Sequence, residues 1–228
     1  MRSPGEKKSL WKEKTLISFG TAYYITRVNE VSRGKEVVME GKNLIYQCDI
    51  SIVATNLYED NNEFPYEATN ICRYEIVNYL YSIRSNIKFH FYGPISFQEL
   101  YPDCYKGFVT YNNCKKIFSN SKINLSIHPL IYELNDHNCE KEYFSERVPQ
   151  ILGCKGLLMT NSYFHHLLKP DIDYIHINKD NYKEKINEII NNSHTYDKIR
   201  FNGYQKGLLY YQWNNWAIKI HNILNYTD

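Results

Sequence analysis

Residues 142–160, EYFSERVPQILGCKGLLMT, are the stretch that decides the fold. Ser145 is a good N-cap residue because its hydroxyl can accept a hydrogen bond from the amides of a first helical turn, so we expect a short helix over 146–154. Pro149 falls within that first turn, where its missing N–H costs little. A Lys-Gly break then leads into an apolar segment, which we expect to form a buried strand over 157–160.

The start of this expected helix is suited to binding an anion. The amides of a first helical turn have no partner within the helix, and the helix dipole favours negative charge there. Glu142 and Gln150 are eight positions apart, so one polar side chain precedes the helix and the other lies inside it. This spacing can place one group on a sugar and the other on a ribose, with a diphosphate between them.

The same residues resemble the E-x7-E region of the GT-B glycosyltransferases. In that region Glu, any residue, Phe, Gly, four residues and a second Glu lead into a helix of small residues, a Gly and an apolar strand. Glu142, Phe144 and Gly156 match this pattern. Ser145 stands where the family usually has Gly, and Gln150 stands where it usually has the second Glu.

Arg147 gives a closer resemblance to the spore-maturation (CgeB-like) and group 1 branch, which carries an Arg just before the second acidic position. The similarity extends more loosely from about residue 44 to the C-terminus. It implies a nucleotide-sugar (donor) binding domain over 44–228, which corresponds to the C-terminal half of a GT-B enzyme. Residues 1–43 would be an N-terminal extension and a remnant of the acceptor-binding half.

The resemblance also implies roles for the residues of this region. Glu142 would bind sugar hydroxyls and Arg147 would pair with the diphosphate, which makes them the expected catalytic residues. The backbone amides of Ser145 and Glu146 would bind the diphosphate, and Gln150 would bind the ribose diol. The alternatives stay open: a solvated charge for Glu142, a surface salt bridge for Arg147, an ordinary helix cap for Ser145 and a half-buried polar residue for Gln150.

Further candidates for binding the nucleotide-sugar lie where strands are expected to end or where helices are expected to begin. They are Thr55, Asn56, Arg73, Tyr92, Gly93, Tyr111 and His128. Arg73 would reach the same anion as the strand-end loop, Tyr111 would frame the base, and His128 would bond a phosphate or the ribose. A surface charge, a core tyrosine and a structural histidine are the respective alternatives.

Composition limits the class of protein. A chain of 228 residues with 43% hydrophobic residues can form one α/β domain with a substantial core. A net charge of +2 is too balanced to favour nucleic acid or a membrane surface as the partner. The 22 tyrosines are most simply explained by codon bias in an AT-rich genome, so we draw no function from them.

The cysteines and histidines do not indicate a metal site. None of the six cysteines forms a C-x-x-C pair, no grouping of His and Cys has zinc spacing, and no carboxylate or Cys lies at ligand spacing from His165 and His166. We therefore expect free thiols, a reducing cytoplasmic location and no bound metal or cofactor. The N-terminus has no signal-peptide pattern, and no apolar run approaches 18 residues, so we expect no transmembrane segment.

Strands and helices are expected to alternate along the chain. Strands are expected over 15–26, 49–55, 88–92, 122–127, 157–160 and 173–177, and helices over 67–84, 114–120, 146–154, 182–192, 196–205 and 208–224. A further short helix and a turn at Gly107 are expected within 95–112. This order predicts an α/β fold with a Rossmann-like parallel sheet and helices on both faces. Ligands of such sheets bind beyond the carboxyl ends of the strands, here in the loops 55–62, 92–96, 128–142 and 161–166.

Two functions from different classes follow. The first is a metal-independent glycosyltransferase, with a weak preference for retention, that moves a sugar from a nucleotide diphosphate sugar to an unknown acceptor. The second is a non-catalytic nucleotide-binding or protein-interaction module derived from such an enzyme. Any catalysis would then need a partner chain, a dimer or a missing upstream piece that completes the cleft, because this chain is short for a two-domain GT-B enzyme.

Overall fold

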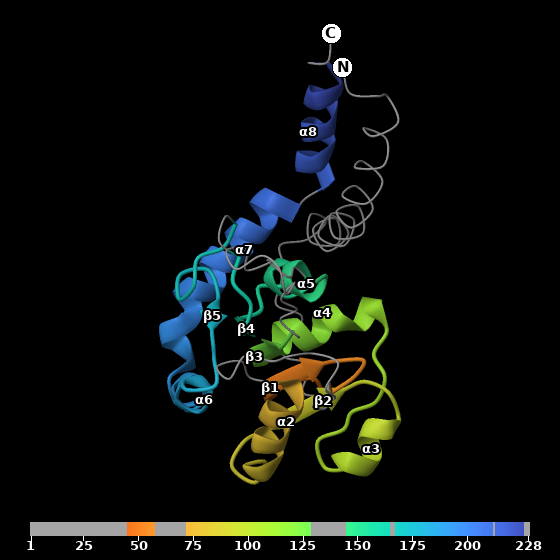
Figure 1. The fold of residues 1–228 in the computed structure, drawn as a ribbon, viewed down its shortest axis with the longest axis vertical. Helices are drawn as coiled ribbons and strands as arrows, with labels where there is room; N and C mark the ends of the chain where they lie inside the picture. The colour runs from red at the N-terminus through yellow and green to blue at the C-terminus, as the bar shows by residue number, and fades with distance from the viewer. Residues whose placement is uncertain (1–44, 58–71, 129–144, 165–166, 212, 226–228) are drawn as a thin grey trace, which may run out of the picture.

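The computed structural model describes residues 45–57, 72–128, 145–164, 167–211 and 213–225 (Figure 1). The expected strand over 15–26, the extension over 1–43 and the candidate residues Glu142 and Phe144 lie outside these ranges. None of the described helices is long and apolar enough to cross a membrane.

A single sheet of five parallel strands forms the centre of the fold. The strands are β1 (Cys48–Val53), β2 (Phe89–Tyr92), β3 (Ser121–Ser126), β4 (Leu158–Thr160) and β5 (Ile175–His176), in the spatial order β2-β1-β3-β4-β5. Ile50 of β1 is paired with Phe89 on one side and with Ile123 on the other. The strands are buried along most of their length, as expected when helices cover both faces of a parallel sheet.

Helices cover both faces of this sheet. They are α2 (Arg73–Ser82), α3 (Ser96–Leu100), α4 (Tyr111–Asn120), α5 (Arg147–Gly153), α6 (Tyr182–Asn191), the 3₁₀ helix η1 (Ser193–Tyr196), α7 (Asp197–Tyr211) and α8 (Trp213–Asn225). Ile76 of α2 and Ile186 of α6 belong to one core cluster, and Ile117 of α4 and Ile151 of α5 belong to a second. Figure 1 shows α2 and α4 on opposite sides of the sheet, so the predicted Rossmann-like fold is confirmed.

The predicted strands within the described residues agree with the observed strands to within about two residues, but three helices differ. The helix expected over 67–84 is observed as α2 from Arg73 to Ser82, because Cys72 is already in the extended conformation of an N-cap. Helix α4 begins at Tyr111, three residues before the predicted start at 114, because Thr110 is already in the extended conformation of a helix N-cap. Helix α7 continues to Tyr211 although a break was expected near Gly207. Gly207 lies against the side chain of Leu152 in α5, so the absence of a side chain serves helix packing there.

Gly203 of α7 provides a test of this packing. A Cβ atom at Gly203 would meet the carbonyl oxygen of Asp173 and, at 2.8 Å, the Cδ2 atom of Leu152. We expect Gly203→Ala to lower the free energy of unfolding by about 1–3 kcal/mol, because a backbone carbonyl cannot move aside easily. Urea denaturation at 25 °C measures the change.

Gly207→Ala is the matched control in the same helix. Its Cβ would meet the Cβ of Leu152 at 3.2 Å, a contact that a shift of a few tenths of an ångström between α7 and α5 relieves. The better helix propensity of Ala opposes this contact by about 1 kcal/mol, so we expect a net change near zero. Equal losses of stability in the two variants would contradict the described packing of α7 on α5.

Candidate functional site

The strand order defines where a ligand would bind. The chain passes from β1 to β2 on one side, and it then crosses over to β3 on the other side of β1. Because the two crossovers lead away from each other, the carboxyl ends of β1 and β3 flank the topological switch point, where open α/β sheets bind their ligands. Thr55 and Asn56 follow β1 and are exposed, and His128 follows β3.

Arg73, the first residue of α2, joins the two sides of the switch point. Its guanidinium is buried, and its Nη1 atom donates to the carbonyl oxygen of Asn56 at 2.6 Å and to the Oδ1 atom of Asn56 at 3.0 Å. Its Nη2 atom donates to the carbonyl oxygen of Ile127 at 2.5 Å. Hydrogen bonds of a charged group are worth about 1.5–3 kcal/mol each, so Arg73 fastens the segment after β1 to the segment after β3.

His128 is held in place by the neighbouring strands and is only 3% exposed. The side chain of Asn161, directly after β4, accepts from the backbone N–H of His128 at 2.9 Å and donates to its carbonyl oxygen at 2.8 Å. The imidazole Nε2 of His128 shares a hydrogen bond of 2.8 Å with the hydroxyl of Ser126. Three hydrogen bonds therefore position His128 directly, one from Ser126 to the ring and two with the side chain of Asn161. A fourth, from Arg73 to the carbonyl of Ile127, fixes the preceding residue.

The imidazole of His128 is neutral at physiological pH. Burial, and then the positive charges of Arg73 and Arg147, lower the pKa of His128 to about 3. The charge of Arg147, the first residue of α5, thus acts on the end of β3 together with that of Arg73. The two guanidinium groups bring positive charge to this edge of the sheet, whereas the neutral imidazole brings none.

The start of α5 differs in one detail from the prediction. The N-cap residue is Glu146, not Ser145, and the side chain of Glu146 makes no capping bond. The hydroxyl of Ser145 still accepts from the N–H of Arg147 at 3.2 Å, and its carbonyl accepts from the N–H of Val148 at 3.0 Å. Since Pro149 has no N–H, the amides of this turn are already used or missing. The amides of Ser145 and Glu146 donate to no described residue, and these are the two amides that the sequence pointed to.

Gln150 and Tyr111 are brought together although they come from separate segments. Gln150 is buried in α5, and its side chain forms a hydrogen bond with that of Tyr111 at the start of α4. Burial raises the pKa of Tyr111, the bond to Gln150 lowers it, and the charge of Glu146 raises it. The Tyr111 side chain is partly exposed, so this pair presents a polar and aromatic surface beside α5.

Two predicted residues lie elsewhere in the fold. Tyr92 ends β2 and is buried in the core, where its hydroxyl lies 3.2 Å from the Nδ1 atom of His90. Gly93 donates its N–H to the carbonyl of Gly107 at 3.2 Å, and a side chain on it would meet the carbonyl of Ala54. Both residues are thus engaged in holding β2 against its neighbours, on the far side of β1 from the switch point.

Sequence reasoning did not identify Ser126 and Asn161, which hold His128. Both residues lie at or just after the end of a buried strand, which was the available signal, but a polar residue at a strand end does not by itself reveal its partner. Across the described parts of the chain, no group of three or more His, Cys, Asp or Glu side chains is arranged to hold a metal ion. The metal independence expected from the resemblance stays a prediction.

The five parallel strands and the helices on both faces define a Rossmann-like α/β domain. A family model described as "Glycosyl transferase-like" matches residues 73–222. This match covers more than half of the chain, so the chain belongs to the glycosyl transferase-like family. The predicted glycosyltransferase resemblance is thereby confirmed, while the CgeB-like branch and the assignment to a C-terminal half stay predictions. No curated protein matches the chain.

Solved structures show the same fold at low sequence identity. The crystal structure of TarM has a TM-score of 0.51 and 12% identity, and the similarity covers 78% of this chain and 36% of that one. The pneumococcal O-GlcNAc transferase GtfA, in complex with UDP and GlcNAc, has a TM-score of 0.46 and 13% identity over 77% of this chain and 36% of that one. The likeness to TarM is one of fold alone, and the lower score of GtfA carries no argument. The chain spans about a third of the length of these proteins.

The buried neutral His128 predicts a pH dependence of stability. Its folded-state pKa of about 3 lies below the value of about 6.5 in an unfolded chain, so the unfolded state binds more protons between these values. Stability is therefore lost as pH falls from about 6.5, by about 2 kcal/mol at pH 5 from this residue. Urea denaturation at pH 7 and pH 5 measures the loss.

His128→Gln should remove this contribution while leaving that of His90, whose pKa burial and then the charges of Lys106 and Lys88 lower to about 4. The NMR signals of the His128 ring should not titrate between pH 8 and pH 5. A ring that titrates with a midpoint above pH 5 would contradict a neutral, enclosed His128.

Proposed function

We propose that the chain is the donor-binding half of a GT-B glycosyltransferase and binds a nucleotide diphosphate sugar at the switch point between β1 and β3. One observation carries the proposal: in a chain of the glycosyl transferase-like family, Arg73 bonds the segments that follow β1 and β3, and the charges of Arg73 and Arg147 both act on His128 there. A diphosphate is the anion that such a positive, partly buried site favours.

The groups at the switch point have different parts in this proposal. The guanidinium of Arg147, in the first turn of α5, can offer two parallel donors to phosphate oxygens. Arg73 makes three hydrogen bonds to Asn56 and Ile127, so it contributes its charge and holds the two loops together. His128 stays neutral beside these charges and can hydrogen-bond without adding repulsion.

In glycosyl transfer, the departing diphosphate must be stabilised as it leaves the sugar. The bond between the anomeric carbon and the diphosphate oxygen breaks, the acceptor oxygen bonds to that carbon and loses its proton, and negative charge grows on the diphosphate. Preorganised positive groups and amides stabilise that charge without a metal ion. We assign this part to Arg147 and to the amides of Ser145 and Glu146.

The two ends of the donor are assigned from the sequence resemblance. Glu142 would bind the sugar hydroxyls, with retention of the anomeric configuration as the weaker expectation. The paired side chains of Gln150 and Tyr111 would bind the ribose and frame the base, since Gln150 stands at the family's second acidic position. Thr55 and Asn56, exposed at the end of β1, would line the phosphate side.

The acceptor and its binding half complete the proposal. The matched region is about a third of the length of TarM and GtfA. The acceptor (a glycan, a protein or a small molecule) would therefore meet the donor in a cleft completed by a partner chain, a second copy or another part of the protein. The five described cysteines, Cys48, Cys72, Cys104, Cys114 and Cys154, are free thiols, which supports the proposed cytoplasmic location.

A thermal-shift screen with UDP-, GDP- and ADP-glucose tests donor binding. Ligand that binds only the folded state raises stability by about 2.7 kcal/mol at a hundredfold excess over the Kd. We expect one of the three nucleotide sugars to raise the melting temperature. Arg147→Gln should lower the affinity for that ligand by about tenfold or more, because a charged contact to phosphate is lost.

Arg84→Gln is the matched control, because Arg84 forms an exposed ion pair with Asp103, outside the switch point. This variant should bind the nucleotide as the unchanged protein does. If no nucleotide raises the melting temperature, the donor-site proposal fails. Binding without transfer or hydrolysis, even with candidate acceptors, would favour the non-catalytic module.

A further inference from the structure

An exposed aromatic ring stands at the carboxyl edge of the sheet, beside the switch point but outside the groups described above. Tyr163 follows the end of β4 by three residues and is 40% exposed. Its ring stacks on the imidazole of His176, with the ring centroids 3.9 Å apart and the planes inclined by 26°. His176 ends β5 and is 8% exposed, so one ring of the stack is buried and the other is on the surface.

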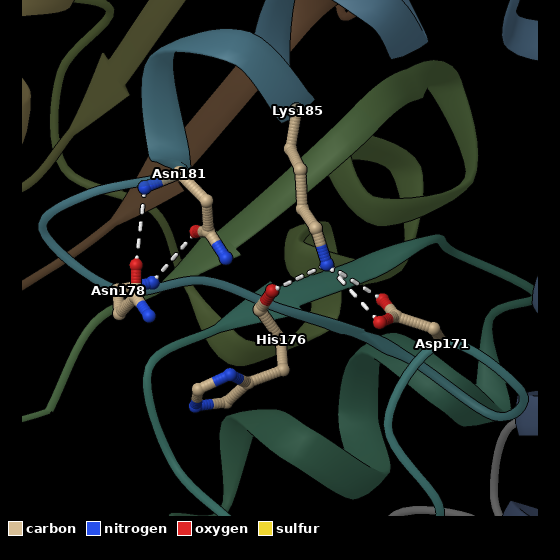
Figure 2. Close-up of polar contacts among 5 residues, drawn as sticks. All are labelled: Asp171, His176, Asn178, Asn181 and Lys185. Carbon is tan, nitrogen blue, oxygen red and sulfur yellow. Dashed lines mark hydrogen bonds and ion pairs between the residues drawn. The ribbon is translucent and has the colours of Figure 1, made fainter.

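The ring beneath Tyr163 is braced by an ion pair. The Nζ atom of Lys185 in α6 donates to the carbonyl oxygen of His176 at 3.0 Å and to both carboxylate oxygens of Asp171 at 2.9 and 3.1 Å. Figure 2 shows the imidazole of His176 pointing away from Lys185, so the ion pair fixes the backbone while the ring remains available to stack.

The turn between β5 and α6 is fixed as well. Asn178 and Asn181 exchange two hydrogen bonds, from the Asn178 N–H to the Asn181 side chain at 2.9 Å and from the Asn181 N–H to the Asn178 side chain at 3.0 Å (Figure 2). A stacked ring on a braced strand end loses little conformational entropy when a ligand binds.

The position of Tyr163 relates it to the proposed diphosphate site. Tyr163 is two residues from Asn161, whose side chain binds the backbone of His128. Neighbouring strands lie about 4.8 Å apart, so the end of β4 is one strand, and the end of β5 two strands, from the end of β3. A sugar attached to a diphosphate at the switch point is of a size to reach this part of the edge.

We propose that Tyr163 is a stacking platform for a pyranose ring, held in orientation by His176. This inference rests on the proposed function. The face of an aromatic ring carries partial negative charge and is apolar, whereas one face of a pyranose presents C–H groups with partial positive charge, so the two surfaces are complementary. The pyranose belongs either to the donor sugar or to the acceptor, and both sources offer the same chemistry.

Calorimetric titration of Tyr163→Ala distinguishes the two sources. In the donor arm, UDP and UDP-glucose are titrated, or the GDP or ADP pair if that nucleotide binds in the screen. Loss of the ring should weaken the nucleotide sugar by about threefold to tenfold and leave the nucleoside diphosphate unchanged. In the acceptor arm, methyl glucoside is titrated in the presence of the nucleoside diphosphate. If the pyranose belongs to the acceptor, the loss of affinity should appear in this arm instead.

Tyr163→Phe and Phe201→Ala are the controls. The first keeps the ring and should bind as the unchanged protein does. The second removes a 57%-exposed aromatic ring from α7. Phe201 follows Arg200, whose guanidinium donates to the carbonyl of Lys122 at the amino end of β3, opposite to the switch point. Phe201→Ala should leave both arms unchanged. Melting temperatures of all variants report whether each remains folded.

The outcomes separate this inference from the proposed function. If Tyr163→Ala changes neither the affinity for the nucleotide sugar nor that for methyl glucoside, the platform proposal is overturned and the donor-site proposal is unaffected. If folded Tyr163→Ala no longer binds the nucleoside diphosphate, the platform proposal is also overturned, because the ring would then act on the diphosphate site. Absence of nucleotide binding by the unchanged protein overturns both proposals.

Discussion

The arrangement of the candidate site depends on the buried guanidinium of Arg73. Removing a charged group from water costs several kcal/mol unless its donors are satisfied. Here three hydrogen bonds to Asn56 and Ile127 offset that cost, and they can form only when the ends of β1 and β3 lie at the correct separation. The same bonds therefore stabilise the fold and set the distance between the two loops of the switch point.

Asn161 extends this constraint to the next strand. Its side chain binds both backbone groups of His128, so the end of β4 is fixed to the end of β3, which Arg73 already joins to the end of β1. Tyr163 follows Asn161 by two residues. The proposed recognition of a diphosphate and an attached sugar requires phosphate-binding and sugar-binding groups at a constant distance. The polar contacts across β1, β3 and β4 would provide such a distance.

The fold could be predicted from the sequence to a large extent, and the candidate site less so. Short apolar runs separated by amphipathic helices gave the five strands, because both faces of a parallel sheet must be apolar. The polar partners escaped prediction for a physical reason. Arg73 was expected to contact an anion, which stays a prediction, and its observed bonds to Asn56 and to the carbonyl of Ile127 join segments that no local pattern of the sequence brings together. The pairing of Gln150 with Tyr111 likewise depends on how α4 and α5 pack.

The sequence by itself determined the class of fold, the short helix α5 and its following strand, and membership of the glycosyltransferase group, because these follow from local periodicity and from a contiguous motif. Only the tertiary structure decided which residues meet at the switch point, that His128 is neutral, and that Tyr163 rests on His176. Hydrogen bonds and charges act over a few ångströms, and the distances between residues far apart in the chain exist only once the sheet has assembled.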